Sequence, residues 1–251
     1  MECKQFLTLF LLLAVFDSYL AESPKIPDYI HICHRSDPKI NECIRNTVHD
    51  MRPYLGDGIK ELNVPPLEPL YIGDLNILDG GQNGFTIKTK NLNIFGAANF
   101  EIKKLTALDQ GRHIDFEMVL PRLHGEGTYD VSGQLLALPL KGNGRFSGNF
   151  TNFTAFVKVL FDIKTDKDNV DRVGIQNLEV KIKMGKGRIR LYNLFNGDKT
   201  LGDIINETIN QNFETFTMEL IPPIERALEK KFFTIAGKIM ETFTYDELFP
   251  V

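Results

Sequence analysis

Apolar and polar residues alternate through the middle of the chain, between residues 70 and 194. The segments 114–120 and 178–184 place an apolar residue at every even position, and Ile189 and Leu191 continue the alternation further on. A period of two is typical of a β-strand with one buried face and one wet face. Residues 155–163 are apolar at every odd position and also carry Phe156 and Leu160, so this strand should bury part of both faces. The segment is predicted to form a β-sheet.

Glycine-rich stretches fall between these runs, at residues 80–84, 142–144 and 185–187. Glycine reaches the positive φ that tight hairpins need, so each stretch is predicted to be a turn. Short connections between consecutive strands predict a mostly antiparallel sheet.

Residues 200–243 follow a different period, with apolar residues at steps of three or four, as in an amphipathic helix. The stripe passes through Pro222 and Pro223 in phase, so we expect these prolines to kink the helix and not to end it. At ~1.5 Å per residue, one continuous helix would be roughly 60 Å long. An apolar stripe of that length must be buried along the whole helix. Only the preceding sheet, bent around the helix, is long enough to bury it. The stripe comprises Leu201, Ile205, Ile209, Phe213, Phe216, Leu220, Ile224, Leu228, Phe232, Ile235, Ile239 and Phe243.

The N-terminal part of the chain, residues 24–64, is predicted to be helical. Asp37 and Pro38 can begin a helix that runs through Cys43 to about Tyr54. The proline-rich segment 64–70 is then an extended connector. These elements indicate an α+β fold, in which a curved sheet and a helix enclose an elongated interior. That interior is either an apolar ligand cavity or an ordinary filled core, since natural ligand sites are concave and mostly apolar.

Residues 1–21 are predicted to be a signal peptide. The first five residues carry one lysine, residues 6–16 are apolar apart from Thr8, and Ala21 supplies a small residue for cleavage. The run is too short to span a bilayer, which takes roughly 20 residues. A buried N-terminal helix is the alternative. Cleavage leaves residues 22–251, which we expect to form a single extracellular domain.

Cys33 and Cys43 remain after cleavage, and a secreted chain meets an oxidising compartment. A disulfide between them would stabilise the fold by roughly 2–3 kcal/mol. A metal site formed by His31, Cys33 and His34 is the alternative.

Charge disfavours two classes of partner. Cleavage removes one basic and two acidic residues, which changes the net charge from −4 to −3. Nucleic acids and anionic membranes both reward clustered basic residues. One basic run is present, and it is predicted to be a solvated outer face; contact with an acidic partner or a membrane is the alternative. The run is Lys181, Lys183, Lys186, Arg188 and Arg190.

The sequence shows no catalytic motif. It contains no G-x-S-x-G elbow, no H-E-x-x-H and no P-loop, and its five histidines are scattered. An enzyme is therefore not expected, nor is a metal or cofactor. Three glycosylation acceptors begin at Asn149, Asn152 and Asn206. We favour Asn152 over Asn149, because the strand at 155–163, extended back unbroken, would point only Asn152 outward; a bulge or turn between the two residues would reverse the choice.

Several segments together resemble the takeout and juvenile-hormone-binding protein family of insects, over nearly the whole mature chain. They are Cys33 with Cys43, the segment 65–70 (PPLEPL), the glycine-rich stretch 125–144, the segment 195–203 (FNGDKTLGD) and the segment 245–250 (YDELFP). The resemblance implies a long helix wrapped by a highly curved antiparallel sheet, the super-roll of tubular lipid-binding (TULIP-like) proteins. It also implies one N-terminal disulfide. Blood hormone carriers of this family have a second disulfide, and this chain has no cysteines for one, so it is more similar to the takeout branch.

The resemblance further implies an internal tunnel for a terpenoid such as juvenile hormone, a fatty acid or a similar lipid. Strand alternation and the helix stripe supply the residues expected to face it. Tyr129, in the glycine-rich stretch, is expected either to offer a polar contact to the ligand or to lie at the rim with its hydroxyl in water. The candidates are Phe116, Met118, Tyr129, Val131, Val157, Val159, Phe161, Val180, Ile182, Phe213 and Phe216.

The function expected on this basis is that of a secreted, monomeric carrier in haemolymph or another extracellular fluid. No nucleic acid and no stable membrane insertion are expected, and no receptor is identified. Two alternatives stay open. One is a membrane- or lipopolysaccharide-interacting host-defence protein of related fold, which the net charge of −3 disfavours. The other is an enzyme that cleaves a lipid ester, for which no catalytic constellation is present.

Overall fold

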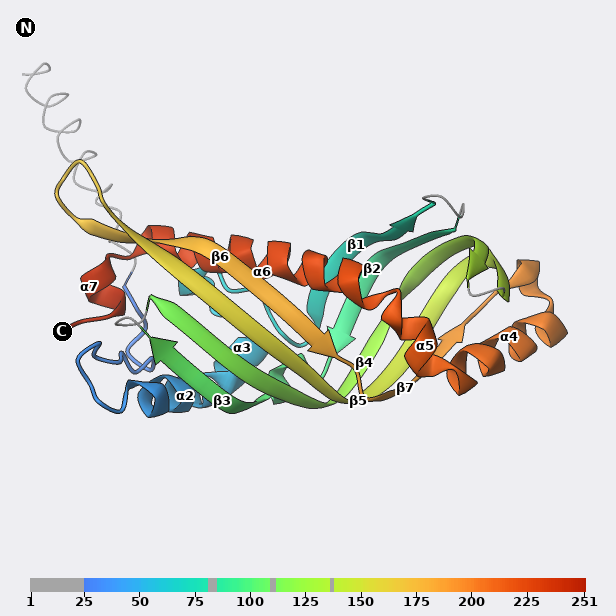
Figure 1. Ribbon diagram of the computed structural model, residues 1–251, viewed down its shortest axis with the longest axis horizontal. Helices are drawn as coiled ribbons and strands as arrows, with labels where there is room; N and C mark the ends of the chain where they lie inside the picture. The colour runs from blue at the N-terminus through green and yellow to red at the C-terminus, as the bar shows by residue number, and fades with distance from the viewer. Residues whose placement is uncertain (1–24, 81–84, 109–111, 136–137) are drawn as a thin grey trace, which may run out of the picture.

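The computed structural model describes residues 25–80, 85–108, 112–135 and 138–251. The predicted signal peptide and most of the predicted turn at residues 80–84 lie outside the described residues. The molecule is elongated, with α2, α3 and α7 at one end and α4 at the other (Figure 1). Among the described residues, no helix has both the length and the apolar content needed to cross a membrane.

The N-terminal region is helical, as predicted, but its helix is divided. Helix α2 spans Ile40–Asp50 and α3 spans Arg52–Asp57, with Met51 between them. Pro53 lies in the first turn of α3, where its missing N–H costs nothing, so it begins a second helix where the sequence suggested an end. A 3₁₀ turn, η1, follows at Lys60–Leu62.

Seven antiparallel strands form one sheet in the order β1-β2-β4-β5-β6, with β3 pairing β4 and β7 pairing β5. The longest strands are β4 and β5, of 23 and 28 residues, which form one long hairpin. The bounds are β1 Leu70–Asp79, β2 Thr86–Phe95, β3 Glu101–Leu108, β4 His113–Leu135, β5 Leu138–Thr165, β6 Asp171–Lys183 and β7 Lys186–Leu191, with 3₁₀ turns η2 at Ala97–Asn99 and η4 at Phe195–Gly197. The predicted antiparallel sheet is confirmed.

Two of the predicted turns are wrong. Residues 142–144 lie inside β5, and a Cβ on Gly144 would come within 2.4 Å of the carbonyl oxygen of Tyr192. Glycine at this position therefore serves close backbone approach. Around Gly185 the chain does not reverse, because β6 and β7 run the same way along β5 and in one register. A Cβ on Gly185 would lie 2.3 Å from the carbonyl oxygen of Thr151.

The inward side of the sheet switches along a line that crosses three strands. The flanking pairs place Pro121 of β4 opposite Asn152 of β5, and Asn152 opposite Gly185. In β4 and in β5, the residues that face the interior are even-numbered on one side of this line and odd-numbered on the other. Asn152 has a left-handed φ of 53°, which asparagine tolerates better than most residues. The local turn of the backbone exchanges the two faces while the register continues.

The C-terminal stripe forms helices, but not one continuous helix. The segments are α4 (Lys199–Gln211), α5 (Phe213–Met218) and α6 (Ile221–Thr242). The first break lies at Asn212, whose φ of −110° and ψ of 31° leave the helical region. The second lies just before Pro222 and Pro223, which occupy the first turn of α6. Leu201, at the start of the stripe, is exposed.

Helix α6 lies along β6 and also contacts β1, so it spans the space between the two outer strands of the curled sheet (Figure 1). Strand β6 nevertheless has an outer edge, whose N–H groups would lack partners. Glu225 accepts a hydrogen bond from the N–H of Ile182 (2.8 Å), and Glu229 accepts one from the N–H of Val180 (3.0 Å). Side chains of α6 thus pair the edge of β6.

Side chains of helix α4 pair the outer edge of β7 in the same way. The amide of Asn206 accepts from the N–H of Leu191 (2.8 Å) and donates to its carbonyl oxygen (2.9 Å). Asn210 makes the same two bonds with Ile189, at 2.8 and 2.9 Å. Four residues of helix rise ~6 Å and two residues of strand ~6.6 Å, so side chains four apart on a helix reach alternate residues of a strand.

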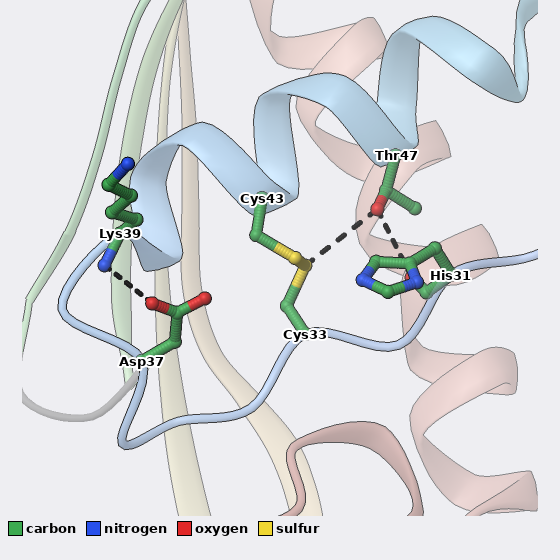
Figure 2. The surroundings of a disulfide bond; sticks show 6 residues. All are labelled: His31, Cys33, Asp37, Lys39, Cys43 and Thr47. Atoms are coloured by element: carbon green, nitrogen blue, oxygen red, sulfur yellow. Dashed lines mark hydrogen bonds between the residues drawn. A yellow bond between two sulfur atoms is a disulfide. The ribbon is translucent and has the colours of Figure 1, made fainter.

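At the opposite end, the N-terminal segment holds the C-terminus. The Cys33 and Cys43 sulfurs are joined, so the disulfide fastens residues 25–39 to α2 (Figure 2). The guanidinium of Arg35 donates to Asp246 (2.9 Å) and to the carbonyl oxygen of Phe249 (3.0 Å), and it lies over the ring of Tyr245. These contacts fix the short helix α7 (Tyr245–Leu248).

Candidate ligand-binding site

The interior contains a cavity of about 330 Å³ between the sheet and helices α5 and α6. It lies where three groups of buried side chains meet: one around Tyr129 and Leu140, one around Phe100 and Leu120, and one around Val180. A fourth group, around Phe243, fills the end formed by the N- and C-terminal segments. The cavity volume falls within the range of about 300–1,000 Å³ that small-molecule sites occupy.

The wall of the cavity is almost wholly apolar and comes from most strands of the sheet. Strands β1, β2, β4, β5, β6 and β7 each contribute residues from their inward side, and α5 and α6 close the cavity opposite them. The lining residues are Leu67, Leu70, Ile72, Leu75, Ile77, Ile87, Thr89, Leu92, Ile94, Ala97, Phe100, Met118, Leu120, Leu123, Gly125, Tyr129, Val131, Leu140, Phe146, Phe150, Phe153, Ala155, Val157, Val180, Met184, Ile189, Leu191, Phe216, Thr217, Leu220, Ile224, Leu228 and Phe232.

Six of the eleven residues predicted from the sequence line this cavity together. They are Met118, Tyr129, Val131, Val157, Val180 and Phe216.

The other five do not line this cavity, and their contact with a ligand stays a prediction. Phe116, Val159 and Ile182 pack in the group around Val180 but do not line the cavity. Phe161 faces the ring of Phe249, and Phe213 lies against Phe150. All five have inward-facing positions, but the unfilled space does not extend to them.

Tyr129 lies in the wall of the cavity, which the sequence left as one of two possibilities. Its hydroxyl donates a 2.7 Å hydrogen bond to the carbonyl oxygen of Tyr192. Burial raises the pKa of the phenol to about 12, because ionisation would place a charge in an apolar surrounding. Tyr129 is thus neutral at physiological pH, and its hydroxyl proton is used in the hydrogen bond to the backbone.

Two further hydroxyl groups belong to the wall, and the sequence reasoning missed both. Thr217 of α5 donates to the carbonyl oxygen of Glu214 at 3.0 Å. Thr89 of β2 lies opposite Tyr129 in the sheet, and its hydroxyl oxygen has no hydrogen-bond partner among the described residues. Among the described residues that line the cavity, none carries a charge.

Helix residues beyond Phe216 were also absent from the predicted site. Leu220, Ile224, Leu228 and Phe232 all line the cavity. They belong to the predicted helical stripe, and their spacing of four was the signal that would have found them.

The groups that suggested other chemistry have structural partners. His31, Cys33 and Cys43 lie within 4.8 Å of one another, but the disulfide consumes both thiols that a metal would need (Figure 2). Three members of the basic run form ion pairs with helix residues: Lys181 with Glu225, Arg188 with Glu207 and Arg190 with Asp203, at 2.9–3.1 Å. The run is therefore partly neutralised by its own chain.

The three glycosylation acceptors differ in accessibility. Asn149 and Asn152 are both exposed, because the strand exchanges its two faces between them. The strand continues through both residues, but the alternation on which Asn152 was favoured does not, so exposure does not separate the two acceptors. Asn206 is buried, and its amide pairs the edge of β7.

The profile of the family described as haemolymph juvenile hormone binding protein matches residues 9–250. The circadian clock-controlled protein daywake of Drosophila melanogaster is 28% identical over 201 residues, which is 77% of each chain. Its counterpart in Drosophila yakuba is 26% identical over 200 residues, covering 76% of this chain and 77% of that one.

Among solved structures, takeout 1 of Epiphyas postvittana superposes with a TM-score of 0.77 at 23% identity, over 88% of this chain and 99% of that one. This similarity shows the same fold. A lipopolysaccharide binding protein gives a TM-score of 0.32 at 14% identity, over 81% of this chain and 40% of that one, which is too weak to bear on function.

Proposed function

This chain belongs to the haemolymph juvenile hormone binding protein family, and on that premise we propose that it is a secreted carrier of a small hydrophobic molecule. The single observation that carries the proposal is the interior cavity of about 330 Å³ with an apolar wall. Protein interiors are close-packed, so an unfilled space of this size forfeits many contacts unless a ligand restores them.

Takeout-like carriage of a terpenoid or a similar lipid fits this cavity better than the two other functions considered. The ion pairs of residues 181, 188 and 190 reduce the basic surface that an anionic membrane would attract. The lipid esterase lacks support because the wall holds hydroxyl groups but no described histidine or acidic residue to activate them. We further propose that the protein is a monomer.

Filling the cavity tests the proposal. Val157 lines the cavity, whereas Val159, two residues along the same strand and in the same buried group, does not. We expect Val157→Trp to lower affinity for the neutral probe N-phenylnaphthylamine at least tenfold with little loss of stability. Val159→Trp should cost about 1–3 kcal/mol of unfolding free energy by overpacking, and leave the affinity of the folded fraction near that of the wild type.

The proposal is wrong if delipidated wild-type protein binds no apolar probe and both tryptophan variants unfold. Secretion is tested separately. Insect cells expressing the full chain should release it, and sequencing of its N-terminus should show residues 1–21 removed.

A further inference from the structure

We infer that the cavity takes a neutral ligand that offers a hydrogen-bond-accepting oxygen, such as the carbonyl oxygen of an ester or ketone or the oxygen of an ether, and that Thr89 donates to that oxygen. This inference rests on the proposed function and narrows it. It starts from the unpaired hydroxyl of Thr89 in the cavity wall.

Thr89 is 7% exposed, and its hydroxyl oxygen has no partner in the described part of the chain. Leaving a buried hydroxyl unpaired is unfavourable, because the group gives up its hydrogen bonds to water and gains none in return. Buried polar groups are paired in the great majority of proteins, so an exception in a cavity wall needs an explanation. A ligand oxygen in the cavity would supply the missing acceptor.

The neighbouring hydroxyl groups do not offer a free proton. Tyr129, opposite Thr89 on the adjacent strand, donates to the carbonyl oxygen of Tyr192, and Thr217 donates to that of Glu214. Among these three hydroxyl groups of the wall, only that of Thr89 donates no hydrogen bond within the described part of the chain. Thr89 lies opposite Tyr129, which packs in one cluster with Phe216 of α5, so a ligand oxygen held at Thr89 would fix the orientation of the molecule in the cavity.

The absence of charge in the described wall sets the ligand's ionisation state. A carboxylate in this cavity would be desolvated with no lysine, arginine or histidine to pair it among the described lining residues. Burying an unpaired charge costs far more than one hydrogen bond can return. An ionised fatty acid is therefore disfavoured, and its neutral ester is favoured.

The test compares three ligands of equal chain length: a long-chain methyl ester, the corresponding alkane and the free acid held ionised at pH 8. Each is titrated against N-phenylnaphthylamine bound to delipidated protein. The variants are Thr89→Val, which keeps the shape and removes the hydroxyl, and Thr89→Ser, which keeps the hydroxyl. Thr89→Val should fold at least as stably as the wild type, because it removes an unpaired polar group.

We expect Thr89→Val to weaken the ester about tenfold, which is the range of one buried hydrogen bond, and to leave the alkane unchanged. Thr89→Ser should retain the preference for ester over alkane. The wild type should bind the ester at least tenfold more tightly than the ionised acid.

Two results overturn the inference while leaving the carrier function intact: Thr89→Val changing ester and alkane affinity equally, or the ionised acid binding as tightly as the ester. If the delipidated wild type binds neither the probe nor any of the three ligands, the carrier function itself fails.

Discussion

The amide of Asn206 distinguishes it from the other two glycosylation acceptors. It donates to the carbonyl oxygens of Leu191 and Gly202 and accepts from the N–H of Leu191. A glycan on this nitrogen would break the pairing of β7 and could not fit in a buried site. We expect peptide mapping of protein secreted by insect cells to find glycan on Asn149 or Asn152 and an unmodified Asn206.

Glycosidase treatment followed by intact mass measurement provides the control. An Asn206→Gln variant should show the same glycan mass as the wild type but lower stability, because its longer side chain cannot reproduce the two-point pairing. Glycan found on Asn206 in folded protein would contradict the arrangement of α4 against β7.

At the residue scale, the sequence predicted which side of a strand faces inward and not where the interior is unfilled. Val157 and Val159 have the same alternation and the same burial, yet only Val157 lines the cavity. The difference depends on side chains from other elements that reach the same depth. Thr89 was missed because a threonine in a strand is unremarkable until its hydroxyl is shown to lack a partner.

Among the elements, the outer edge of β6 gives the sharpest stability prediction. Glu225 is 7% exposed, accepts from the N–H of Ile182 and also pairs with Lys181. We expect Glu225→Leu to lower the free energy of unfolding by about 2–3 kcal/mol, because the edge N–H is left buried without an acceptor. Glu225→Gln retains an acceptor oxygen and should cost about 1 kcal/mol. Urea denaturation measures both.

Lys181→Ala separates the edge bond from the ion pair. The lysine is largely exposed, and exposed ion pairs contribute less than about 1 kcal/mol. If Glu225→Leu is no worse than Lys181→Ala, the carboxylate does not stabilise the edge.

The elements themselves were predicted where one period dominates, as in β4, β6 and the helical stripe. Turn predictions failed at Gly144 and Gly185 because glycine serves close backbone approach as well as chain reversal. The exchange of faces at Asn152 was missed because it involves three strands at once, and no single strand records the position of its neighbours. Asn206 was predicted only as a glycosylation acceptor and Asn210 was not singled out, although their spacing of four matches a strand edge.

For the whole molecule, ligand binding and stability should be linked. A ligand that binds only the folded protein adds about 2.7 kcal/mol to the unfolding free energy at a hundred times its Kd. For a protein of this size that corresponds to a rise in Tm of about 5–11 °C. We expect thermal scans of delipidated protein to show this rise with a long-chain methyl ester and not with the Val157→Trp variant. An equal rise in both would place binding outside the cavity.

The side-chain pairing of the sheet edge also sets an order of events during synthesis. The edge strands lie at residues 171–191, and the groups that pair them come later, at Asn206, Asn210, Glu225 and Glu229. The ribosome delivers the chain from its N-terminus. The strands of the sheet therefore emerge before the helices that pair its edge and cover its interior. Until α6 arrives, the nascent chain presents an open strand to its neighbours, and folding chaperones would have to shield it.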